Sequence, residues 1–197
     1  VTNQVLRDDL AARGLDLPLD EIMHLFVGGV MAGVAVEARK RGATIPDDWL
    51  ETIYPKIYTA LEHTVTTIPH IEAVLDALDA ANIPYAIGSN GRLEKMDLTL
   101  GRTGLLARFK NRMYSGQDCV APKPAPDVYL KAASDAGVDP ADCVVIEDSA
   151  NGARAGLAAK MYTFGFTHDT NPDALAPYCD ALFDDMAKLP KLLGLDL

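Results

Sequence analysis

Short apolar runs alternate with amphipathic segments from residue 68 to the end of the chain, and this alternation leaves few folds open. The expected strands are 84–88, 113–115, 143–146, 162–166 and 181–183, and the expected helices between them are 69–81, 92–100, 126–136 and 151–159. Strands that alternate with helices in this way form a parallel, doubly wound sheet. We therefore predict an α/β fold with a Rossmann-like core.

The first third of the chain follows a helical pattern instead. Asp20 is expected to cap one short helix. A later helix carries apolar residues at helical spacing, namely Trp49, Ile53, Ile57 and Leu61. Because no strand is expected before residue 65, the sequence predicts a helical module over residues 1–64 and an α/β core over residues 65–197.

The charge balance narrows the class of partner. With 28 acidic and 18 basic residues the net charge is -10, which argues against nucleic acid or an anionic membrane as the main partner. A small anionic ligand is still compatible with this charge. The three cysteines are far apart in the sequence and do not have the spacing of metal ligands. We expect them to be free thiols, which are usual in proteins of the reducing cytosol. We expect a cytoplasmic protein, monomeric or weakly dimeric, that binds a small molecule.

Polar residues follow several of the predicted strands directly. Ligands of such sheets bind at the carboxyl ends of the strands, so these residues are candidates for one site. They are Ser89, Asn90 and Gly91 after the first strand, Lys123 in the loop after the second, and Glu147, Asp148 and Ser149 after the third.

These residue types suit a phosphate and a divalent cation. Adjacent carboxylates such as Glu147 and Asp148 repel unless a cation or a proton intervenes, and Mg²⁺ prefers such oxygen ligands together with substrate phosphate. Lys123 supplies a positive charge, and the turn at Ser89 offers backbone amides to a phosphate. Each element has a structural alternative: a capped turn, a solvated lysine, and acids at a helix N-terminus.

Three segments resemble known motifs: "GSNG", "KPAPDVYL" and "VVIEDSANGARAGLAAKM". They are similar to motifs II, III and IV of the haloacid dehalogenase-like superfamily, in the subgroup that contains phosphatases and β-phosphoglucomutase. The resemblance extends over nearly the whole chain and implies that residues 1–64 form a substrate-selecting cap. Gly28 and Gly29 lie where such caps usually face the substrate.

The resemblance also implies a role for each matching residue. Ser89 would bind a phosphate oxygen, with the amides of Asn90 and Gly91 beside it, and Lys123 would stabilise the phosphate and the nucleophile. Asp148 would bind Mg²⁺ directly and Glu147 would bind it directly or through water. The residues expected to order this loop are Ser149 and Asn151.

The nucleophile of the family is an aspartate in an Asp-x-Asp motif after a central strand, and the printed sequence has no such motif. Without that strand, the strands ending at 88 and 146 would each have an unpaired edge. We therefore expect the natural protein to have further residues upstream of Val1. A catalytically inactive fragment is the rival hypothesis.

The favoured function is a Mg²⁺-dependent phosphatase of a small phosphorylated metabolite, such as a sugar phosphate, that works through an aspartyl-phosphate. The nearest alternative is a phosphosugar mutase resembling β-phosphoglucomutase. A non-catalytic phosphate-binding protein is the alternative from another class. A 2-haloacid dehalogenase fits less well because it has little use for the pair Glu147 and Asp148.

Overall fold

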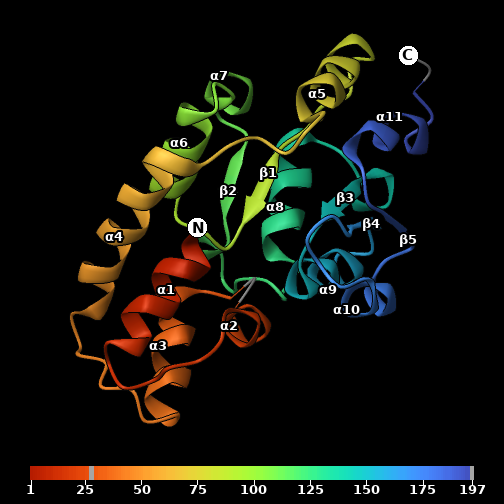
Figure 1. Ribbon diagram of the computed structural model, residues 1–197. Coiled ribbons are helices and arrows are strands. Elements are labelled where there is room, and N and C mark those ends of the chain that lie inside the picture. Colours follow the sequence, from red (N-terminus) through yellow and green to blue (C-terminus); the bar gives the residue numbers. More distant parts are fainter. Residues whose placement is uncertain (27–28, 196–197) are drawn as a thin grey trace. The chain divides into compact units, whose positions relative to one another are not determined.

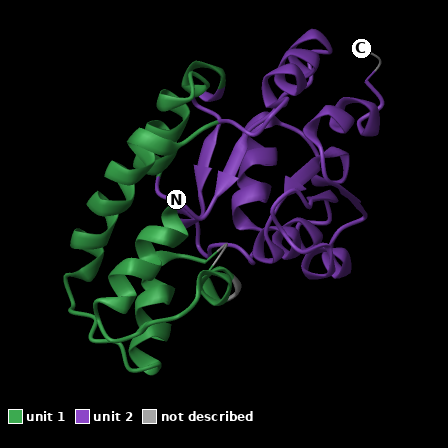
Figure 2. Cartoon of the chain, viewed as in Figure 1, with its two compact units in different colours: residues 1–66, 93–108 green, residues 67–92, 109–197 purple. Residues whose placement is uncertain are grey.

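The computed structural model describes residues 1–26 and 29–195, so the predicted role of Gly28 lies outside the described residues. The chain divides into two compact units (Figure 2). Unit 1 comprises residues 1–66 and 93–108, and unit 2 comprises residues 67–92 and 109–197. The sequence pattern predicts residues 93–108 as part of the α/β core, whereas their contacts group them with the N-terminal helices.

All regular elements among the described residues of unit 1 are helices. Its helices are α1 (Thr2–Ala11), α2 (Leu19–Phe26), α3 (Met31–Lys40), α4 (Trp49–Thr64) and α6 (Leu93–Arg102), with α7 (Leu106–Phe109) at its boundary (Figure 1). The four apolar residues that predicted α4 are all buried, as their spacing requires. Asp20 lies in the first turn of α2 and is not its cap, because the helix begins at Leu19, two residues earlier than expected. Among the described residues, no helix combines the length and the apolar character that crossing a membrane would require.

A buried carboxylate joins α1 to α4. The Asp9 side chain is 4% exposed and accepts hydrogen bonds from Arg13 Nε at 2.7 Å, Trp49 Nε1 at 2.7 Å and Lys56 Nζ at 2.6 Å. Buried charges are tolerated when they are paired and hydrogen-bonded, and Asp9 satisfies both conditions.

Unit 2 contains parallel strands in two sheets. One sheet pairs β1 (Ile87–Ser89) with β2 (Met113–Ser115), and the other has the order β3 (Val144–Glu147), β4 (Tyr162–Phe166), β5 (Ala181–Phe183). Gly88 pairs with Tyr114, and Ile146 pairs with Phe164. The α/β prediction is confirmed. The first strand begins at residue 87 and not at 84, and Pro84 has no N–H to donate to a ladder.

Two helices connect these sheets. Helix α8 (Asp127–Ala136) contacts β1 and β2, α9 (Ala150–Ala158) contacts β3 and β4, and the two helices contact each other. Their buried faces share one apolar cluster with β3, formed by Val128, Tyr129, Ala133, Val145, Ala155, Ala159 and Met161. The other α-helices of unit 2 are α5 (Ile71–Ala80), α10 (Pro172–Leu175) and α11 (Leu189–Leu192).

Each of the two sheets has an edge without a partner strand in the part of the chain that the structure describes. β1 pairs only with β2, and β3 pairs only with β4, within residues 1–26 and 29–195. Lys123 contacts both strands, at Gly88 of β1 and at Glu147 of β3, so the carboxyl ends of these two strands lie close together.

Candidate active site

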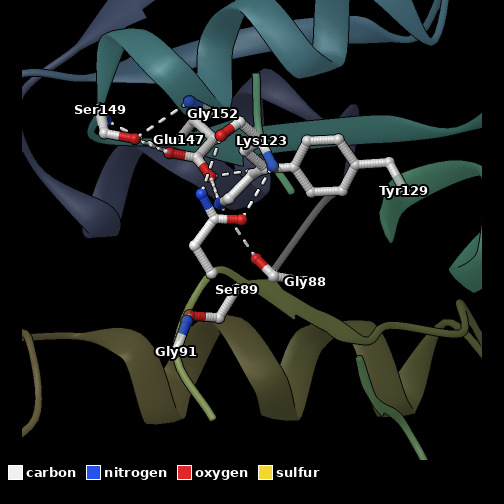
Figure 3. Close-up of polar contacts among 9 residues, drawn as sticks. Gly88, Ser89, Gly91, Lys123, Tyr129, Glu147, Ser149 and Gly152 are labelled. Atoms are coloured by element: carbon white, nitrogen blue, oxygen red, sulfur yellow. Dashed lines mark hydrogen bonds and ion pairs between the residues drawn. The ribbon is translucent and has the colours of Figure 1, made fainter. Parts of the chain in front are cut away.

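Lys123 lies at the centre of the polar cluster between the two sheets (Figure 3). Its side chain is 7% exposed and forms an ion pair with Glu147. The ammonium also donates to the carbonyl oxygen of Gly88 at 3.2 Å and to the hydroxyl of Tyr129 at 3.3 Å. The structure therefore brings together two of the predicted site residues that are 24 positions apart in the sequence.

Glu147 has hydrogen-bond partners on both of its carboxylate oxygens. Oε1 accepts from Lys123 and from the Tyr129 hydroxyl, and Oε2 accepts from the Ser149 amide at 3.2 Å and the Ser149 hydroxyl at 3.0 Å. The side chain is 6% exposed. In this arrangement the negative charge of Glu147 is neutralised by Lys123.

Gly152 gives Glu147 the space that it occupies. A Cβ added at Gly152 would lie 1.9 Å from the Glu147 Cδ. The Gly152 amide donates to the Ser149 hydroxyl at 3.1 Å, so Ser149 caps helix α9 and contacts Glu147 at the same time. Asn151 lies half-buried in the first turn of that helix.

Asp148 is more exposed than Glu147, although both residues line the same cavity. It is exposed as a residue and lines a cavity of about 170 Å³ together with Ile68, Ile146, Glu147, Phe166, Asp169 and Met186. Partial burial among these walls, and then repulsion from Glu147, raises the pKa of the Asp148 carboxyl. Thr170 Oγ1 donates to the Asp148 carbonyl oxygen at 2.7 Å and thereby fixes the main chain at this residue.

The turn that is predicted to bind phosphate also holds the main chain of Lys123. Ser89 Oγ accepts from the Gly91 amide at 3.0 Å. The side chain of Asn90 is buried and bonds the main chain of Lys123, donating to its carbonyl oxygen at 2.9 Å and accepting from its amide at 2.8 Å. Only the backbone amide of Asn90 was predicted to take part in the site, because nothing in the local pattern indicated a side-chain partner 33 residues away.

A magnesium ion fits part of this arrangement. No group of three or more His, Cys, Asp or Glu residues is placed to hold a metal ion among the described residues. Mg²⁺ commonly uses only one or two protein carboxylates and completes its shell with water and phosphate. Asp148 suits this role because its negative charge is disfavoured and because the described residues that line its cavity include no lysine or arginine. Glu147 would be free to join it only after Lys123 has moved away.

Comparison with known proteins identifies the family. Residues 6–160 match the model of the haloacid dehalogenase-like hydrolases, so the chain belongs to this family and the resemblance of its motifs is confirmed. A HAD family hydrolase from Deinococcus radiodurans R1, solved with bound phosphate and sodium, is 33% identical with a TM-score of 0.75; the match covers 98% of this chain and 87% of that one.

Curated relatives from Escherichia coli (strain K12) extend this comparison. The 6-phosphogluconate phosphatase is 26% identical over 181 residues, which cover 91% of this chain and 80% of the relative. Hexitol phosphatase A is 34% identical over 109 residues, which cover 52% of this chain and 50% of the relative.

Proposed function

We propose that this hydrolase is a Mg²⁺-dependent phosphatase of a small phosphorylated metabolite, such as a sugar phosphate. The observation that carries the proposal is the meeting of Lys123 and Glu147 at the carboxyl ends of β1 and β3, with Asp148 facing the adjoining cavity. A cation, a lysine and a backbone turn at one sheet edge are suited to binding a phosphate and stabilising the charge that develops on it.

Each residue then has a role in handling the phosphate. Lys123 neutralises a phosphate oxygen, and Ser89 with the amides of Asn90 and Gly91 orients the others. Asp148 holds the metal ion and Glu147 joins it directly or through water, while Ser149 and Asn151 keep the loop in place. The bound ion would supply positive charge to the phosphoryl group during transfer.

The nucleophile in this proposal is an aspartate on an upstream strand that would lie between β1 and β3. Support comes from the two edges, which have no partner strand in the described part of the chain. The aspartate oxygen would attack phosphorus as the ester P–O bond breaks, and the alcohol would leave with a proton from a neighbouring acid. Water would then hydrolyse the aspartyl-phosphate. The intact mass of the natural protein tests this point, because an upstream strand requires a mass above 21.1 kDa.

The choice of a sugar-type substrate is supported by the relatives. Two of them are named for phosphatase activity on 6-phosphogluconate and on hexitol phosphates. Both names describe phosphate esters of polyhydroxylated chains, so this class of compound is the first to test here.

The decisive experiment measures phosphate release by the full-length protein from a panel of sugar, sugar-acid and hexitol phosphates. We expect release with Mg²⁺ and none with excess EDTA. Conversion of a sugar phosphate into its isomer without phosphate release would replace the phosphatase with a mutase. Phosphate binding without turnover of any compound would instead indicate the non-catalytic alternative.

A further inference from the structure

Tyr129 contacts both charged groups of the site, although no motif assigns it a role. Its hydroxyl donates to Oε1 of Glu147 and accepts from Nζ of Lys123 at 3.3 Å (Figure 3). The residue is 9% exposed, and burial followed by the charge of Glu147 raises the pKa of Tyr129 well above its ordinary value. The hydroxyl therefore keeps its proton at physiological pH and acts as a donor to Glu147.

The ring of Tyr129 is held firmly by its surroundings. It belongs to the buried cluster that α8 and α9 share with β3. The backbone of β1 lies directly against it, because a Cβ added at Gly88 would come within 2.9 Å of the ring atom Cε1. The hydroxyl consequently has little freedom to follow another partner if Lys123 moves.

Movement of Lys123 creates a problem for Glu147. In the proposed function the ammonium turns toward a phosphate oxygen, and this removes the cation paired with a carboxylate whose side chain is 6% exposed. While no metal ion compensates its charge, a buried carboxylate without a partner is costly, so Glu147 then competes with the phosphate for Lys123. The donors that stay in place are the Tyr129 hydroxyl on Oε1 and the two Ser149 groups on Oε2.

We propose that Tyr129 is a positioning residue that holds the carboxylate of Glu147 while Lys123 binds phosphate, so that its hydroxyl sets the phosphate affinity of the site. This inference rests on the proposed function of Lys123. It differs from a purely structural role, in which the hydroxyl would stabilise the fold equally with and without phosphate.

The test is the affinity for inorganic phosphate, measured by calorimetry on the full-length protein in EDTA, where no metal ion compensates the charge of Glu147. A wild-type protein that does not bind phosphate under these conditions would itself overturn the proposal. Tyr129→Phe keeps the ring and removes the hydroxyl. We expect its Kd for phosphate to rise about tenfold, because the released Glu147 then lacks one of its donors. The matched control is Tyr114→Phe, which removes a hydroxyl from a ring packed against the same cluster and should leave the Kd unchanged.

A second variant separates positioning from packing. In a Glu147→Gln background the side chain is neutral and competes weakly for Lys123, so the added effect of Tyr129→Phe on the Kd should largely disappear. An equal effect in both backgrounds would overturn the proposal. A Kd of Tyr129→Phe within twofold of the wild-type value would also overturn the proposal for Tyr129. That result would leave the proposed phosphatase function intact. A wild-type protein that neither binds phosphate nor releases it would overturn both.

Discussion

The side chain of Asn90 holds the main chain of Lys123 at two points, with a donor at 2.9 Å from the carbonyl oxygen and an acceptor at 2.8 Å from the amide. Both residues are buried, and the contact joins the end of β1 to the loop after β2. Gly116 leaves the room for it, since a Cβ there would lie 2.4 Å from Asn90 Oδ1. Asn90 thus fixes the main chain of Lys123 at the site.

Asn90→Asp should therefore weaken both stability and turnover. A carboxylate can still accept from the Lys123 amide but faces the Lys123 carbonyl oxygen without a proton to donate. We expect a loss of about 1–3 kcal/mol in the free energy of unfolding. Denaturant titration measures it, and Asn171→Asp is the control. Asn171 is an exposed helix cap whose Oδ1 accepts from Asp173, and an aspartate caps equally well. An equal free energy of unfolding for the two variants would contradict the role of the Asn90 side chain in holding Lys123.

Lys123→Ala should lower kcat by about 10²–10³-fold, the usual cost of removing a charge that stabilises the transition state. The variant also leaves Glu147 buried without its cation, so its melting temperature should fall. Steady-state kinetics on the best substrate gives both constants. A rise in KM with unchanged kcat would reduce Lys123 to a ground-state binding residue. Lys131→Ala, at an exposed lysine of α8, should leave both constants unchanged.

Asp148→Asn should abolish Mg²⁺-dependent turnover while keeping the fold. Burial and the neighbouring Glu147 already raise the pKa of Asp148, so removing its negative charge relieves an unfavourable interaction in the metal-free protein. We expect an equal or higher melting temperature without metal, and no further rise when Mg²⁺ is added. Thermal unfolding with and without Mg²⁺ measures this difference, and full activity of the variant would remove Asp148 from the metal site.

Gly152→Ala should displace the carboxylate of Glu147. The new Cβ would occupy the position of the Glu147 side chain, and overpacking of this kind costs about 1–3 kcal/mol. Loss of turnover should accompany the loss of stability. Gly101→Ala is the matched control in helix α6, where the nearest atom to a new Cβ is 3.9 Å away. That variant should be unchanged or slightly more stable, because alanine favours the helix. Stability of Gly152→Ala equal to wild type would show that Glu147 can be accommodated elsewhere.

Asp9→Asn should destabilise unit 1 in a pH-dependent way. Burial would raise the pKa of Asp9, but hydrogen bonds from Arg13, Lys56 and Trp49 outweigh burial and hold the pKa below its ordinary value of 3.8. Its stabilisation is therefore complete above that value and is lost as the pH falls through the folded-state pKa.

At neutral pH we expect Asp9→Asn to cost about 1–3 kcal/mol, and the difference from wild type should shrink below pH 4. Urea titrations at several pH values measure this difference. Asp8→Asn, at the neighbouring position, should change the stability much less at every pH, because the ion pair of Asp8 with Arg7 is exposed to solvent. A constant difference for Asp9→Asn across the pH range would mean that packing, and not the charge, provides the stabilisation.

Much of this molecule was predictable because its signals are local. The spacing of Trp49 and Ile53 predicted a buried helix face, and the carboxyl-end rule placed Lys123 and Glu147 at one edge. The contact between the Tyr129 hydroxyl and Glu147 was not predictable from the sequence. A tyrosine at this place in helix α8 has the pattern of a core residue, and Glu147 is 18 positions away. The grouping of α6 with α4 was missed for the same reason, because tertiary contacts decide it and local spacing does not.

The discontinuous make-up of unit 1 also has a consequence for biosynthesis. Its chain runs to residue 66, leaves to form α5 and β1 of unit 2, and returns at residue 93 to supply α6. A nascent chain leaves the ribosome from its N-terminus, so the helices of unit 1 emerge long before α6, against which α4 packs. Unit 1 can be completed only after β1 of unit 2 has been translated. It therefore cannot reach its final structure before part of unit 2 has been made, and a stall before residue 108 would expose the surface of α4 that packs against α6.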